Sequence, residues 1–78
     1  MTWDRSKRML IEVGKKYNID YGKVNLNNKK IHVLAIVDEG MIVYKYWQSH
    51  KARWSYQVDH MSYFGMLSNN GWLRRARR

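Results

Sequence analysis

The sequence predicts an α+β fold of two layers, in which a three-stranded antiparallel β-meander is flanked by an N-terminal helix and a short C-terminal helix. Residues 31–58 contain three runs rich in β-branched and aromatic residues, joined by short polar turns. On each side of these runs, apolar residues recur at helical spacing. Turns this short force neighbouring strands to pair antiparallel, so the predicted order is α-β-β-β-α.

The first predicted helix covers residues 2–17. Thr2 can cap it, and Asp4 lies in the first turn, where the helix dipole favours an acidic side chain. Residues 18–28 are rich in Asn, Asp and Gly, which indicates a connecting segment. The apolar residues that recur at helical spacing are Trp3, Leu10, Val13 and Tyr17.

The three strands are expected near residues 30–38, 41–48 and 53–58. The first is apolar on both faces, with Ile31, Val33, Ala35 and Val37 on one of them, which predicts a central strand. Asp38, Glu39 and Gly40 form a tight turn in which Gly40 supplies a positive φ. In the third strand the apolar residues Trp54, Tyr56 and Val58 alternate with polar ones, so their face is expected to lie against the core.

A second helix is predicted over residues 60–69, because Met61, Phe64 and Leu67 are three residues apart and Gly71 provides a stop signal. Trp72 and Leu73 then pack back on the domain or add a short strand. Residues 1–73 make one domain, and residues 74–78 make a basic tail. The predicted core contains Leu10, Val13, Trp54, Tyr56 and Phe64.

Charge and composition limit the possible partners. The 78 residues include 15 Lys and Arg against 6 Asp and Glu, a formal net charge of +9, which indicates a polyanionic partner such as nucleic acid or an acidic protein surface. There is no cysteine, so disulfides and thiolate metal sites are excluded. No apolar run reaches the roughly 20 residues of a membrane span, and the first residues do not resemble a signal peptide.

Aromatic residues interleaved with cations on residues 41–58 favour a non-enzymatic nucleic-acid-binding module, because rings stack on bases while Lys and Arg neutralise phosphates. The ligand would be single-stranded or structured RNA or DNA. Core packing is the competing role for these rings: it is favoured for Trp54 and Tyr56 and left open for Tyr44, Tyr46 and Trp47. The candidate binding residues are Tyr44, Lys45, Tyr46, Trp47, His50, Lys51 and Arg53 on the hairpin, Lys29 and Lys30 before it, and Arg74, Arg75, Arg77 and Arg78 in the tail.

The sequence shows no pattern of metal ligands or paired catalytic carboxylates, so no metal, cofactor or catalytic residue is expected. Asp38 and Glu39 are the only adjacent acids and lie in a predicted turn. The histidines His32, His50 and His60 do not have the spacing of a metal site.

One enzymatic alternative depends on His50. Ser49 and His50 stand beside Lys51 and Arg53, and neighbouring positive charge favours a neutral histidine that can act as a base. This stretch resembles the catalytic stretch of HicA-type messenger-RNA-cleaving toxins, although Gln48 stands where that family has Gly. The resemblance implies a metal-independent ribonuclease that uses His50.

Two further resemblances bear on the partner. The predicted helix–meander–helix order is similar to that of double-stranded RNA-binding domains, although the basic cluster that opens their second helix is missing. The aromatic and basic residues of 44–47 and 53–56 resemble small accessory proteins of bacteriophages, which implies a bacterial cytoplasm. That resemblance supports a second hypothesis from another class, a protein-binding inhibitor of a host enzyme or defence complex, since aromatic residues and Arg are also common interface anchors.

Overall fold

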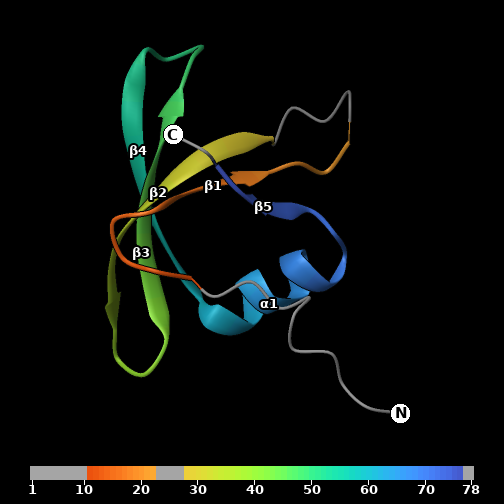
Figure 1. The fold of residues 1–78 in the computed structure, drawn as a ribbon. Helices are drawn as coiled ribbons and strands as arrows, with labels where there is room; N and C mark the ends of the chain where they lie inside the picture. The colour runs from red at the N-terminus through yellow and green to blue at the C-terminus, as the bar shows by residue number, and fades with distance from the viewer. Residues whose placement is uncertain (1–10, 23–27, 77–78) are drawn as a thin grey trace.

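The computed structural model describes residues 11–22 and 28–76, which form a five-stranded antiparallel sheet and one helix (Figure 1). The strand order in the sheet is β4-β3-β2-β1-β5. The predicted α-β-β-β-α order, on which the similarity to double-stranded RNA-binding domains rested, is therefore wrong. The elements are β1 (Lys16–Ile19), β2 (Lys29–Val37), β3 (Met41–Gln48), β4 (Arg53–His60), α1 (Met61–Asn69) and β5 (Leu73–Arg75).

The middle of the chain follows the prediction. β2, β3 and β4 form the expected antiparallel meander, and α1 follows directly after β4. Gly40 in the β2–β3 turn has a φ of +119°, and a Cβ at this position would lie 2.8 Å from Sδ of Met61. The Met61 amide donates to the Gly40 carbonyl at 2.7 Å, so this turn also holds the start of α1.

Residues 11–17, where the sequence predicted the end of the first helix, contain a turn at residues 13–14 and the start of β1. Tyr17 and Ile19 are buried while Lys16 is exposed and Asn18 half-buried, which is the period-two pattern of a strand with one face on a core. Gly14 has a φ of +86°, which does not belong in a helix. Residues 2–10 of the predicted helix lie outside the described residues, and so does Leu10; Val13 is exposed, against its predicted burial.

The stretch after α1 returns the chain to the far side of the sheet. Gly71 and Trp72 donate backward to the carbonyls of Ser68 and Leu67, the two bonds of a Schellman motif, and Gly71 has the positive φ that this motif requires. β5 then pairs antiparallel with β1. Arg74 and Arg75, placed in a basic tail by the sequence, belong to this strand, whereas Arg77 and Arg78 lie outside the described residues.

The helix covers one face of the sheet, which we call the covered face. The ring of Phe64 meets that of Tyr44 edge-on, with centroids 5.5 Å apart. β1, β2, β3 and β5 all contribute to the core on this face, but no residue of β4 is among the buried hydrophobic ones in the described part of the chain. The core residues are Tyr17, Ile19, Ile31, Val33, Ile42, Tyr44, Phe64, Leu67 and Leu73.

A buried hydroxyl links the core to the edge strand. Tyr44 is only 2% exposed, and its hydroxyl donates to Oδ2 of Asp59 in β4 at 2.6 Å. Burial, followed by the bond to the Asp59 carboxylate, raises the pKa of Tyr44 well above its ordinary value. Asp59 is thus engaged by β3, and the residue that caps α1 is His60, whose Nδ1 accepts from the Ser62 amide.

The opposite face, which we call the open face, is not covered by any helix or strand among the described residues. The predicted burial of Trp54 and Tyr56 is wrong: they are 46% and 67% exposed on this face. The reason is that the register of β4 on β3 places Trp54 opposite Trp47 and Tyr56 opposite Lys45, on the face of the sheet that α1 does not cover. A register shift between Val33 and Ala35 also moves Ala35 from the covered face to the open one.

Candidate nucleic-acid interface

The open face is organised as cross-strand rows of side chains. One row crosses four strands, because Lys16 lies opposite His32, His32 opposite Lys45, and Lys45 opposite Tyr56. A second row holds Arg74 on β5, Asn18 on β1 and Lys30 on β2. The Trp47–Trp54 pair joins β3 and β4 near the turn that connects these two strands. Cross-strand neighbours on one face lie about 5 Å apart, so basic and aromatic groups alternate at close spacing.

The tryptophans form a geometrically defined pair. Trp47 and Trp54 meet edge-to-face, with ring centroids 5.4 Å apart and an interplanar angle of 75°. Nζ of Lys45 lies 4.4 Å from the centroid of the Trp54 ring, within the range of a cation–π interaction. Trp47 is 48% exposed and Trp54 46%, so each ring keeps area for a ligand while its orientation is held by neighbours.

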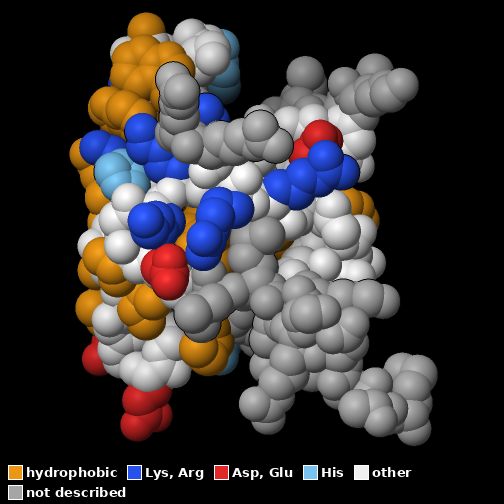
Figure 2. Space-filling view, viewed as in Figure 1, with side chains coloured by type: hydrophobic (Ala, Val, Ile, Leu, Met, Phe, Trp, Pro, Cys, Tyr) orange, Lys and Arg blue, Asp and Glu red, His pale blue; other side chains and the backbone are white. Residues whose placement is uncertain are grey.

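A shallow hollow of about 310 Å³ lies between the basic residues and the tryptophans. In the view of Figure 2, hydrophobic side chains gather at the upper left, over the turn end of the β3–β4 hairpin, and Lys and Arg side chains form a band below them, with acidic side chains beside the band. The hollow therefore presents cationic and aromatic groups together. The residues that line it are Lys16, Lys30, Ile31, His32, Lys45, Trp47 and Trp54.

The acidic residues of the described ranges lie away from this hollow. Asp38 and Glu39 form the β2–β3 turn at the other end of the hairpin, and Asp20 receives the Gly22 amide. Glu12 and Asp59 are engaged on the covered side, with Arg75 and Tyr44 respectively. Among the described residues the hollow is therefore lined by three lysines and by no acidic side chain, which favours an anionic ligand.

Four of the predicted binding residues belong to the open face. Lys30, Lys45 and Trp47 line the hollow, and Arg74 lies opposite Asn18 in the neighbouring row. These four come from β2, β3 and β5, so the sheet brings together residues that are distant in the sequence. The surface extends across the sheet and is not limited to the predicted hairpin.

Other predicted residues point to the covered side. Tyr44 is part of the core, and Tyr46 packs against that core with Nζ of Lys29 4.5 Å from its ring centroid. Ser55 on β4 lies opposite Tyr46 and therefore on the covered face. Arg53 is two residues before Ser55 on the same strand. By this alternation Arg53 does not face the hollow of the open face.

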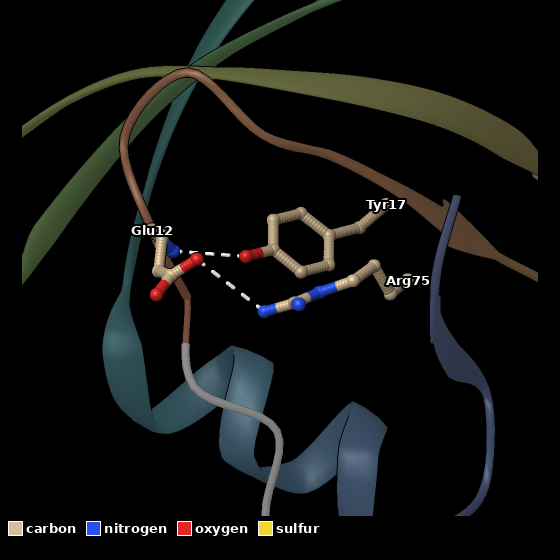
Figure 3. Close-up of polar contacts among 3 residues, drawn as sticks. All are labelled: Glu12, Tyr17 and Arg75. Atoms are coloured by element: carbon tan, nitrogen blue, oxygen red, sulfur yellow. Dashed lines mark hydrogen bonds and ion pairs between the residues drawn. The ribbon is translucent and has the colours of Figure 1, made fainter. Parts of the chain in front are cut away.

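Arg75 is engaged in a contact of its own on the covered side. Its Nη2 lies 3.3 Å from Oε2 of Glu12, while the Glu12 amide donates to the Tyr17 hydroxyl at 2.9 Å (Figure 3). Arg74, one residue earlier, is on the opposite face of the same short strand. Two adjacent arginines that look equivalent in the sequence therefore have different surroundings.

His50 and Lys51 lie in the β3–β4 turn and are exposed. His50 has no hydrogen bond or ion pair with any residue of the described ranges, and within these ranges no three His, Cys, Asp or Glu side chains lie close enough together to hold a metal ion. His50 does line a second hollow of about 330 Å³ at this end of the hairpin. The lining residues are Asn28, Lys29, Tyr46, Trp47, Gln48, Ser49 and His50.

The sequence prediction omitted Lys16, His32, Trp54 and Tyr56 from the binding surface. Lys16 was assigned to a helix, and the two aromatic residues of β4 were assigned to the core. The sequence did contain a signal that some aromatic residues are exposed. β3 carries aromatic residues on both of its faces, so one small core cannot also bury the aromatic residues of the neighbouring strand β4.

Comparison with protein-family models, with curated proteins and with solved structures gives no match to this chain. No helix in the part of the chain that the structure describes is both long and apolar enough to cross a membrane. The geometry of the open face is therefore the feature that bears on function.

Proposed function

We propose that this protein is a small, non-enzymatic nucleic-acid-binding module whose binding surface is the basic and aromatic half of the open face of the sheet. The observation that carries the proposal is the exposed Trp47–Trp54 pair beside Lys16, Lys30 and Lys45, around a hollow that no acidic residue of the described ranges lines. Aromatic rings on a sheet surface stack on bases, and lysines around them neutralise phosphates. The net charge of +9 adds long-range attraction for a polyanion.

The two parts of the surface have different roles in this proposal. Lys16, Lys30 and Lys45 supply a salt-dependent attraction that is the same for every sequence. Trp54 supplies stacking, and its edge-to-face contact with Trp47 holds the ring in place before the ligand arrives. Such preorganisation lowers the entropy cost of binding.

A protein partner is the second candidate, because the far half of the open face is apolar. Val37, Met41, Val43 and Val58 follow the basic rows towards the β2–β3 turn, and Tyr56 lies at the boundary. Tyr56 and Val58 are 67% and 49% exposed. An acidic protein with an apolar centre would match this surface, in line with an inhibitor of a host enzyme or defence complex of the kind that bacteriophages encode.

Trp54→Ala tests the nucleic-acid proposal, with Val58→Ala as the matched control. Both residues lie on β4 and on the open face, with similar exposure. We expect Trp54→Ala to weaken binding of a labelled oligonucleotide by about 1–3 kcal/mol, because one stacking contact is lost. Val58→Ala should leave the affinity unchanged, and a circular dichroism melt shows that each variant is folded.

Three results would contradict the proposal. Equal affinities of wild type, Trp54→Ala and Val58→Ala would exclude stacking on this pair. Loss of binding to an acidic protein in Val58→Ala, without oligonucleotide binding by the wild type, would favour the protein-binding module. Cleavage of the RNA probe that disappears in His50→Ala would favour the toxin-like ribonuclease.

A further inference from the structure

The two edges of the described sheet are very different in length. β4 forms one edge with eight residues, whereas β5 forms the other with three. Six residues of β4 are exposed and two are half-buried. Between Arg53 and Asp59, β4 makes no backbone hydrogen bond to any described segment other than β3. Its outer amides and carbonyls are therefore available for pairing with another strand.

The edge of β4 lacks the features that usually prevent strands from pairing with other chains, which are bulges, prolines and central charges. The register of β4 on β3 runs from Arg53 to His60 without a shift, and the chain contains no proline. The charged residues of β4 are Arg53 and Asp59, which stand near its ends. β5, in contrast, is short and carries two arginines. Only the edge of β4 is thus suited to pairing.

The sequence of β4 is complementary to itself in one antiparallel register, the one centred on Tyr56. A two-fold axis perpendicular to the sheet then places Tyr56 opposite Tyr56 of the second copy, and Trp54 opposite Val58 of the second copy. These three side chains are all exposed on the open face. On the covered face Arg53 lies opposite Asp59 of the second copy. Apolar side chains meet apolar ones, and two pairs of opposite charges form because the interface is isologous.

The groups that this register joins are accessible. Arg53 is exposed and makes no ion pair with a described residue. Asp59 accepts from the Tyr44 hydroxyl through Oδ2, so Oδ1 is the acceptor for Arg53 of the second copy. The neighbouring registers are worse: centring on Gln57 puts Asp59 opposite Ser55 and leaves Arg53 without a partner on β4, and centring on Ser55 shortens the ladder.

We propose that β4 pairs antiparallel with β4 of a second copy of this chain, in the register centred on Tyr56, so that the two sheets become one. This inference goes beyond the proposed function and does not depend on nucleic acid. The basic hollows of the two copies would lie on the same side of the joined sheet. The short β5 strands remain at its ends, so the dimer is closed and does not extend into a fibre. Because the interface is small, the dimer dissociates on dilution.

Sedimentation velocity of the full chain over a range of concentrations tests the dimer, at a salt concentration that screens the repulsion between two chains of charge +9. We expect a monomer in dilute solution and a dimer at high concentration. Tyr56→Lys should weaken dimerisation roughly 10-fold, because a favourable cross-strand pair is replaced by two like charges. Val37→Lys is the matched control: it adds the same charge to the open face on β2, away from this edge, and should dimerise as the wild type does.

Disulfide cross-linking tests the register, since the chain has no cysteine of its own. Tyr56→Cys brings two thiols opposite each other and should form a disulfide-linked dimer under mild oxidation. Val58→Cys should not, because its two thiols would be about 13 Å apart along the strands. A mixture of Trp54→Cys and Val58→Cys should give the mixed dimer, which is identified by its mass.

Several results would overturn the inference. A wild type that is monomeric at every concentration excludes the dimer, and a dimer that Tyr56→Lys leaves unchanged excludes this edge. Equal cross-linking of Tyr56→Cys and Val58→Cys excludes the register. A circular dichroism melt shows that each variant is folded. Oligonucleotide binding by dilute wild-type protein is decided separately, so the proposed function stands or fails independently of the dimer.

Discussion

The two faces of the sheet are formed by the same strands but have opposite chemistry. On the covered face, Tyr44 and Phe64 pack edge-to-face beneath α1, and the Tyr44 hydroxyl is bonded to Asp59. On the open face, Trp47 and Trp54 make a contact of nearly the same spacing with no helix over it among the described residues. One aromatic pair is therefore needed for folding, and the other remains available to a ligand.

The largest expected effect is a difference in stability between substitutions on the two faces of the sheet. Phe64→Ala removes a fully buried ring from the core and should lower the free energy of unfolding by about 3–5 kcal/mol, measured by urea denaturation. Val58→Ala on the open face should change it by no more than about 0.5 kcal/mol. Similar losses of stability in the two variants would mean that the open face is packed in solution, and that the two faces do not differ in burial.

A smaller effect concerns the buried hydroxyl of the covered face. Tyr44→Phe removes the hydrogen bond to Asp59 and should lower the free energy of unfolding at neutral pH by about 1–2 kcal/mol. The folded-state pKa of Tyr44 is raised above 10, so its stabilising contribution is complete below pH 10 and is lost as the pH rises further.

Denaturation at a series of alkaline pH values checks the sign of this effect. Wild-type stability should fall more steeply above pH 10 than that of Tyr44→Phe. The variant should keep a weaker slope, because burial and the hydrogen bond with Tyr63 raise the pKa of Tyr21 to about 12. Parallel curves for the two proteins would show that Tyr44 is not buried as described.

The smallest expected effect is a difference in the salt dependence of binding between substitutions of two adjacent arginines on opposite faces of β5. Arg74→Gln should reduce the slope of log affinity against log salt by roughly 0.7, one lost single-strand phosphate contact. Arg75→Gln should leave this slope unchanged, since Arg75 is paired with Glu12. Point substitutions are required here because deletion of residues 74–78 would remove most of β5. Equal slopes in both variants would place the ligand elsewhere.

The sequence predicted the parts of the fold whose signals are local. Short turns and β-branched runs located β2, β3 and β4, and the spacing of Met61, Phe64 and Leu67 located α1. Tyr17 was assigned to a helix because Val13 and Tyr17 are four residues apart, which fits one face of a helix. The competing strand signal, the alternation of Tyr17 and Ile19 with polar residues, extends over only four residues. Pairing with β2 and β5, which are distant in the sequence, decided between them.

The candidate site was predicted in part for a related reason. The aromatic and basic character of β3 is visible in the sequence, but the side of each residue depends on which face the helix covers. Trp54 and Tyr56 carry the apolar pattern of core residues, and their exposure follows from the register of β4 on β3, which places them on the face that α1 does not cover. The register shift after Val33 is equally invisible, because nothing in the local composition marks it.

The pairing of β5 with β1 has a consequence for the order of folding. β1 lies between β2 and β5, and all of β2, β3, β4 and α1 separate it from β5 along the chain. Closing so long a loop is slow compared with the formation of the β2–β3 and β3–β4 hairpins. We therefore expect a hairpin-containing intermediate in which the outer edge of β1 is unpaired, and in which the Asn18 and Asp20 amides gain hydrogen-exchange protection after those of β3.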